Sequence, residues 1–280
     1  MKFGSSNITS VKLGSASVDK IYVGTNQIYP VSSPAPGPYT PPDYATSGIQ
    51  MYYNPEDPTS YAGSGTTLTD LSGNGYDATL VNGPSFASSY FTLDGVDDYI
   101  ASPNMVSSFN STTSFTVEVW YSPNYTVQGD GGTVLQESGA DTPSTSWYYA
   151  LMEHRKAQFG SLSYDYAGIW KGSYTAINPL ITIGNDVWRQ QVLTYNGING
   201  IIYTNGTNAK SVATSRSTPW NDPSNYGYYL MIGAGSATQQ SGAGANNFTG
   251  KIGIVRAYNR ALSSTEVLQN YNGAKAIYGL

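Results

Sequence analysis

The sequence contains no cysteine, one histidine and unusually little charge. Only 11% of its 280 residues are Asp, Glu, Lys or Arg, whereas about 25% is typical of soluble domains. Without cysteine, the chain can form neither a disulfide framework nor a thiolate metal site. The histidine, His154, stands in the polar run 152–156, which we interpret as a solvated hairpin tip rather than a catalytic base. Because no H-E-x-x-H motif, Walker loop or dinucleotide fingerprint occurs, we do not expect zinc or redox metals.

Basic clusters and long apolar runs are also missing. The net charge is −5 with a pI near 4.7, and Lys and Arg are scattered singly, so we expect no nucleic-acid partner. No run approaches 18 apolar residues, and the first ten residues contain no apolar signal core. We therefore expect neither membrane insertion nor export by a cleaved signal.

What the sequence has in abundance is glycine, tyrosine and small polar residues. It contains 31 Gly and 25 Tyr, which predicts a surface that is polar but largely uncharged, with tyrosines offering a flat apolar face and a hydroxyl. Such a surface suits an extracellular particle or a sugar-facing protein. Tyr and Thr are also simply good strand formers, and the composition leaves both interpretations open.

Short alternating runs separated by turns predict an antiparallel all-β fold. In the stretch 70–101, Gly, Asn and Pro at 72–75 and 82–84 are typical turn residues. The strands predicted around them are Asp77–Val81, Tyr90–Asp94 and Tyr99–Ala101. Residues 114–122 alternate for nine positions, with Phe115 on one face and Glu118 on the other. We predict an antiparallel β-sandwich.

One helix is predicted, close to the C-terminus. Ser263 as N-cap and Glu266 three residues later form a capping box, and Leu262 with Val267 can form a hydrophobic staple. The helix should end near Asn272-Gly273, and we expect it to close one end of the sandwich.

The chain is predicted to have three parts. Residues 1–31 hold three short strand candidates, too small to form a core alone, so this β segment needs a partner or the main domain. Residues 32–44 contain five prolines and predict a semi-rigid polyproline spacer, although an extended chain lying on the sandwich remains an alternative. Residues 45–280 form the large domain.

Four sequence segments resemble the laminin-G-like, concanavalin A-like jelly-roll domains, in that family's order. The segments are DLSGNGYDATLVNGPSF with TLDGVDDYI, then SFTVEVW, then WRQQVLTYNGINGIIYTNG, and finally FTGKIGIVRAYNRALSSTEVLQNYNGAKAIYGL. This resemblance implies a concanavalin-like jelly roll. The opening GSGTTLTDLSGNG and the ending NYNGAKAIYGL look most like those of bacteriophage structural proteins.

The phage resemblance implies a place in a virion. Residues 1–31 would then attach to other virion proteins, and the protein would be assembled in the host bacterial cytoplasm and act as a homo-oligomer, which we expect to be a trimer. The jelly roll would bind host-surface carbohydrate without catalysis. The alternative is a purely structural decoration or fibre protein that stabilises the capsid or tail.

Glycoside hydrolysis is a further alternative, because concanavalin-like jelly rolls include glycosidases. Those enzymes need two carboxylates about 5 Å apart facing the sugar. The strand that could supply them offers Glu118 alone, beside Thr116 and Trp120. Glu153 or Asp186 could supply a second carboxylate from another strand, but we do not expect an enzyme.

Calcium is the one cofactor that the sequence suggests. Asp94 and Asp97, with Asp98 next to them and Gly95 for a sharp turn, gather hard oxygen ligands, and the resembled family often has a structural calcium. The alternative is that Asp94 and Asp97 accept hydrogen bonds from turn N–H groups.

Aromatic residues in polar, Gly-rich segments are the candidates for stacking on a sugar. We select Trp170, Trp220 and Tyr226, and we expect these to be exposed on loops. Each could instead cover the edge of the core. Trp120 and Trp188 stand at positions that match the family and are expected to be core residues.

Overall fold

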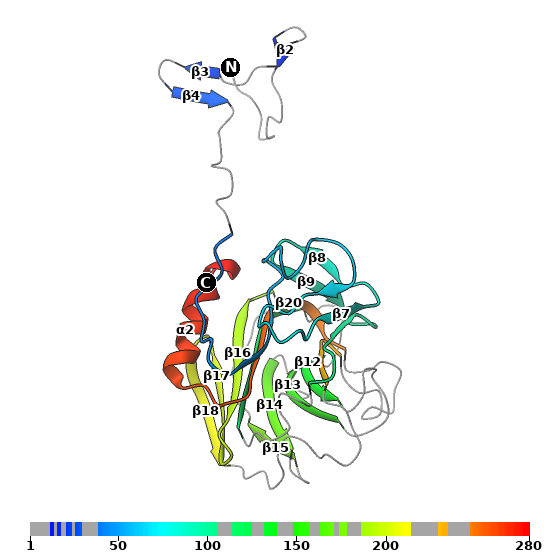
Figure 1. Ribbon diagram of the computed structural model, residues 1–280, viewed down its shortest axis with the longest axis vertical. Helices are drawn as coiled ribbons and strands as arrows, with labels where there is room; N and C mark the ends of the chain where they lie inside the picture. The colour runs from blue at the N-terminus through cyan, green and yellow to red at the C-terminus, as the bar shows by residue number, and fades with distance from the viewer. Residues whose placement is uncertain are drawn as a thin grey trace. The chain divides into compact units, whose positions relative to one another are not determined.

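The computed structural model divides the chain into two compact units, Met1–Pro41 and Pro42–Leu280, which are described separately here (Figure 1). The structure describes the following residues: 12–13, 16–17, 21–23, 26–29, 39–105, 114–124, 132–138, 148–156, 163–170, 174–177, 186–213, 229–234 and 247–280.

The described residues of the smaller unit form two separate two-stranded ladders. β1 (Lys12–Leu13) pairs with β2 (Ala16–Ser17), and β3 (Ile21–Val23) pairs with β4 (Asn26–Tyr29), both antiparallel. The sequence predicted three strands here. The prediction missed β2, because a two-residue strand is too short to show a period of two.

The larger unit is built on two antiparallel sheets, each with an order that differs from chain order (Figure 1). The first, which we call the β12 sheet, runs in the order β15 (Tyr174–Ile177), β14 (Ser163–Trp170), β13 (Tyr148–Lys156), β12 (Gly132–Ser138), β19 (Tyr229–Ile232), β10 (Tyr99–Ala101), β7 (Ala78–Val81), β6 (Thr67–Leu68). The second, the β11 sheet, runs in the order β18 (Thr207–Ala213), β17 (Asn199–Thr204), β16 (Arg189–Tyr195), β11 (Phe115–Pro123), β20 (Thr249–Tyr258), β9 (Tyr90–Asp94), β8 (Ser85–Ala87), with β5 (Ile49–Tyr53) also paired to β20.

The main core lies between these sheets and takes alternate side chains from both. Phe115, Val117 and Val119 of β11 belong to the same buried cluster as Leu230 and Ile232 of β19. Alternation of this kind is what an antiparallel sandwich requires. The predicted fold class, an antiparallel jelly-roll sandwich with one short C-terminal helix, is confirmed.

The C-terminal helix covers a face of the β11 sheet rather than one end of the sandwich. Helix α2 (Ser264–Ala274) begins with the predicted capping box of Ser263 and Glu266 and continues into the 3-10 helix η1 (Lys275–Tyr278). The ring of Tyr271 stacks on Trp120 of β11 at 5.7 Å between centroids, and Figure 1 shows α2 running beside β16, β17 and β18. Among the described residues, no helix has the length and apolar character needed to span a membrane.

Two segments differ from the sequence prediction. Residues 163–170 and 174–177 form the strands β14 and β15, so Trp170, which we expected on a loop, is the last residue of a strand and pairs with Tyr174. His154 lies within β13, opposite Gly132 and Asp165, and not at a hairpin tip. The sequence also predicts a strand at Ala157–Leu162, and this segment lies outside the described residues.

Candidate functional site

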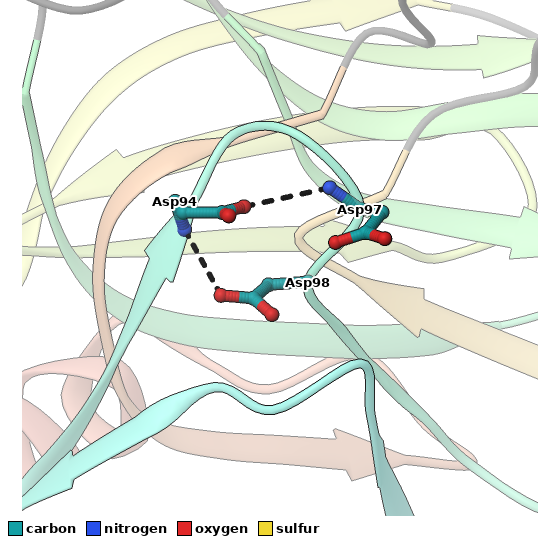
Figure 2. A group of neighbouring side chains, drawn as sticks. All are labelled: Asp94, Asp97 and Asp98. Carbon is teal, nitrogen blue, oxygen red and sulfur yellow. Dashed lines mark hydrogen bonds between the residues drawn. The ribbon is translucent and has the colours of Figure 1, made fainter.

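The connection between β9 and β10 gathers three carboxylates at one point on the surface. Asp94 is the last residue of β9, and Asp97 and Asp98 follow after Gly95, whose φ of 78° makes the sharp turn. One oxygen from each of the three carboxylates lies within 4.8 Å of the others, and Figure 2 shows the three side chains side by side around the turn.

Backbone hydrogen bonds use only part of this acidic loop. The Oδ1 atom of Asp94 accepts a hydrogen bond from the N–H group of Val96 (2.8 Å). It also accepts one from the N–H group of Asp97 (3.4 Å), and Oδ2 of Asp98 accepts one from the N–H of Asp94 (3.2 Å) (Figure 2). The turn bonds considered for Asp94 are therefore present. Within the part of the chain that the structure describes, the carboxylate of Asp97 accepts no hydrogen bond, so it is available to a ligand.

Two asparagines hold the backbone of the loop in place. Asn82 donates from Nδ2 to the carbonyl oxygen of Asp97 (2.9 Å), and Asn247 donates to that of Val96. Asn247 immediately precedes Phe248 of the main core. The loop is therefore fixed from two sides before any ligand binds.

The electrostatics of the acidic loop favour a cation. Burial raises the pKa of Asp98, and the charges of Asp94 and Asp97 raise it further, while the hydrogen bond from the N–H of Asp94 lowers it. Carboxylate oxygens on a sharp turn are the ligand type that calcium takes. The residues present thus fit a calcium ion held by Asp94, Asp97 and Asp98.

Glu118, the carboxylate considered for hydrolysis, is fully buried under α2. Its Oε1 accepts hydrogen bonds from three buried donors: Arg256 NH1 (2.9 Å), Trp120 Nε1 (3.0 Å) and Gln190 Nε2 (2.9 Å). Its Oε2 accepts one from Nδ2 of Asn270 in α2 (2.6 Å). Glu118 therefore joins two neighbouring strands to the helix and does not face solvent.

The predicted aromatic ligands are not placed by the structure. Trp220 and Tyr226 lie outside the described residues, and for Trp170 only the strand position is described. These three residues stay predictions. Trp120 is fully buried, as expected, but in the cluster between the β11 sheet and the C-terminal helices; Trp188 is half-buried against that cluster.

One family model matches residues 94–268, more than half of the chain; it describes the concanavalin A-like lectin/glucanases superfamily. A search of curated proteins found no match.

Solved structures with a similar fold include proteins with bound sugars. A sialidase of Trypanosoma rangeli, solved with 2,3-difluorosialic acid, is 14% identical with a TM-score of 0.58 over 84% of this chain and 34% of the sialidase. Domain 4 of AbnA, an extracellular arabinanase of Geobacillus stearothermophilus solved with arabinotriose, is 14% identical with a TM-score of 0.54 over 80% of this chain and 98% of the domain. The binding domain of botulinum neurotoxin DC, solved with SialylT, is 13% identical with a TM-score of 0.54 over 81% of this chain and 52% of that domain.

The chain spans about a third of the sialidase chains that it matches but nearly all of the arabinanase domain. At these identities the likeness concerns the fold.

Proposed function

Because the chain belongs to the concanavalin A-like lectin/glucanases superfamily, we propose that its larger unit binds carbohydrate without cleaving it. The observation that carries this proposal is the match of nearly the whole arabinanase domain, solved with arabinotriose, to this unit. The sugar-bound toxin domain and sialidase add support. Because one fold can carry many functions, glycan binding is the property to measure.

The absence of catalysis in this proposal is supported by Glu118. Retaining and inverting glycosidases both need a pair of carboxylates that reach the sugar. Glu118 is fully buried and its oxygens are already used by four donors, so it cannot serve as nucleophile or acid toward a surface ligand.

The wider setting that we propose is a bacteriophage virion. The resemblance of both ends of the large domain to phage structural proteins supports it. The two small ladders of the first unit, with strands of two to four residues, suit attachment to another virion protein, because such short hairpins are not stable alone. A homotrimer would raise the avidity of weak contacts with host glycans.

Glycan-array binding of the full chain tests the proposed function. We expect binding to at least one bacterial surface polysaccharide, and we expect at least one of Trp170→Ala, Trp220→Ala and Tyr226→Ala to weaken it about tenfold, as loss of an aromatic contact to a sugar would. A folded chain that binds no polysaccharide would contradict the proposal and favour the structural decoration role.

We also propose that the acidic loop holds a structural calcium ion, whose two positive charges would offset most of the negative charge of the three neighbouring carboxylates. A saturating ion at a hundredfold excess over its Kd contributes about 2.7 kcal/mol, so calcium chloride should raise Tm by about 5–10 °C. Asp97→Asn should remove most of this shift, because it deletes a carboxylate that the fold does not use. Asp43→Asn is the control and should keep the calcium-dependent shift in Tm. Asp43 is exposed, and its carboxylate accepts a hydrogen bond from Gln269 of α2. Differential scanning calorimetry with and without chelator would decide, and equal shifts in both variants would contradict the site.

A further inference from the structure

A row of polar side chains crosses the outer face of the β11 sheet. Thr92 of β9 lies opposite Lys251 of β20, and Lys251 lies opposite Ser122 of β11. Directly opposed residues of antiparallel strands have their side chains on the same face. Phe91 and Leu93, the neighbours of Thr92, belong to the main core, so this row faces away from the core.

Two aromatic side chains border the row. Trp188 immediately precedes β16, and its half-buried ring packs on Tyr278 at 4.3 Å between centroids. The half-buried ring of Tyr90, two residues before Thr92 on the same face of β9, lies 5.6 Å from that of Trp188. Among the described residues, the indole N–H of Trp188 has no hydrogen-bond partner.

A partly exposed ion pair lies beside the Tyr90 ring. The Nζ atom of Lys251 is 3.4 Å from Oδ1 of Asp186, and their side chains are 30% and 55% exposed. The same ammonium lies 5.7 Å from the centre of the Tyr90 ring. Asp186 adopts a φ of 55°, a conformation uncommon outside glycine that Asp and Asn tolerate best. The pair offers both donors and acceptors but no net charge.

We propose that this surface is a subsite for a neutral pyranose of a polysaccharide. We call it the Trp188 patch, formed by Tyr90, Thr92, Asp186, Trp188 and Lys251. The aromatic rings receive the apolar face of the sugar, and the ion pair and Thr92 bond to its hydroxyls. A neutral sugar fits better than an acidic one, because the charge of Lys251 is already matched by Asp186 and the whole chain carries −5.

This subsite rests on the proposed glycan binding, and titration of the full chain with the polysaccharide found on the array tests it. The paired change Asp186→Asn with Lys251→Gln should lower affinity at least about tenfold, since it removes charge-assisted hydrogen bonds. Ser122→Ala should leave affinity unchanged, because this hydroxyl is fully buried and a surface ligand cannot reach it.

Lys275→Gln is the matched control. Its ammonium lies 5.6 Å from the Tyr271 ring, the same kind of contact made by Lys251, and donates a hydrogen bond to Asn272. Among the described residues it makes no hydrogen bond or ring contact with a patch residue, so the affinity of this variant should equal that of the unaltered chain. If the patch variants bind as tightly as the unaltered chain, the sugar lies elsewhere and only the subsite is overturned. If the unaltered chain binds no glycan, both the subsite and the proposed function are overturned. If it binds acidic glycans alone, the proposal of a neutral sugar is overturned.

Discussion

Replacing Glu118 with glutamine is expected to lower the free energy of unfolding by about 3–5 kcal/mol, the usual cost of breaking a buried ion pair from one side. Glu118 and Arg256 are 2.9 Å apart and both side chains are fully buried. Burial alone would lower the pKa of Arg256, yet Glu118, Tyr52 and Tyr258 raise it above its ordinary value. Arg256 therefore stays charged, and its charge is left uncompensated in the variant.

The amide of glutamine cannot take over the hydrogen bonds of Glu118. All four partners are donors, three to Oε1 and one to Oε2. An amide nitrogen placed on either side would face a donor with another donor. Glutamine has nearly the same shape as glutamate, but it cannot restore these hydrogen bonds. Each donor left unpaired lowers the free energy of unfolding further.

Urea denaturation of the full chain measures this effect. Glu266→Gln is the control, because Glu266 also pairs with an arginine, Arg260 at 2.6 Å, but with side chains 28–29% exposed. The hydrogen bond from Arg260 lowers the pKa of Glu266 to about 2. Because this pair is partly exposed, its loss should lower the free energy of unfolding by about 1 kcal/mol or less. If the two variants lose the same free energy of unfolding, burial does not determine how much the Glu118–Arg256 pair contributes to stability.

Local pattern was enough to predict the strands that bury one face against the main core. Strands β9 and β10 have the predicted bounds, and β11 is shifted by one residue from the predicted 114–122. Ser263 and Glu266 lie three residues apart, so the start of the C-terminal helix could also be predicted from the sequence. These features depend on neighbours in the sequence, and such neighbours determine turns, alternation and caps.

Features formed by distant segments were not readable in this way. Every residue of β11 is buried, because α2 covers the face that the alternation assigned to the outside. The pairing of Glu118 with Arg256 joins residues 138 positions apart. Nothing near Glu118 in the sequence distinguishes a buried network from a catalytic carboxylate.

The two candidate sites differ for the same reason. Asp94 and Asp97 could be selected from a five-residue stretch, and the structure brings their carboxylates together with that of Asp98. The Trp188 patch is assembled from β9, β20 and the residues before β16, so strand order had to be known. From the sequence, Trp188 was predicted only to be a core residue.

Replacing Gly273 with alanine is expected to destabilise the larger unit by about 1–3 kcal/mol, as overpacking usually does. In an ordinary helix interior the same change stabilises by about 1 kcal/mol. Here a Cβ would lie 2.0 Å from the carbonyl oxygen of Asp43. The segment 43–45 is bound to α2, with the N–H of Ala45 donating to Oδ1 of Asn270 (2.8 Å) and Gln269 donating to Asp43 (3.1 Å).

Displacement of residues 43–45 should therefore accompany the loss of stability in Gly273→Ala. Amide exchange at Ala45 should become faster, because its hydrogen bond to Asn270 is lost. Asn272→Ala is the control: Asn272 is an exposed neighbour in α2 whose side chain bonds only to Lys275 at 2.9 Å among the described residues, and alanine should keep or raise stability there. If Gly273→Ala is as stable as Asn272→Ala and amide exchange at Ala45 is unchanged, helix α2 does not hold residues 43–45 in place, and the prediction is wrong.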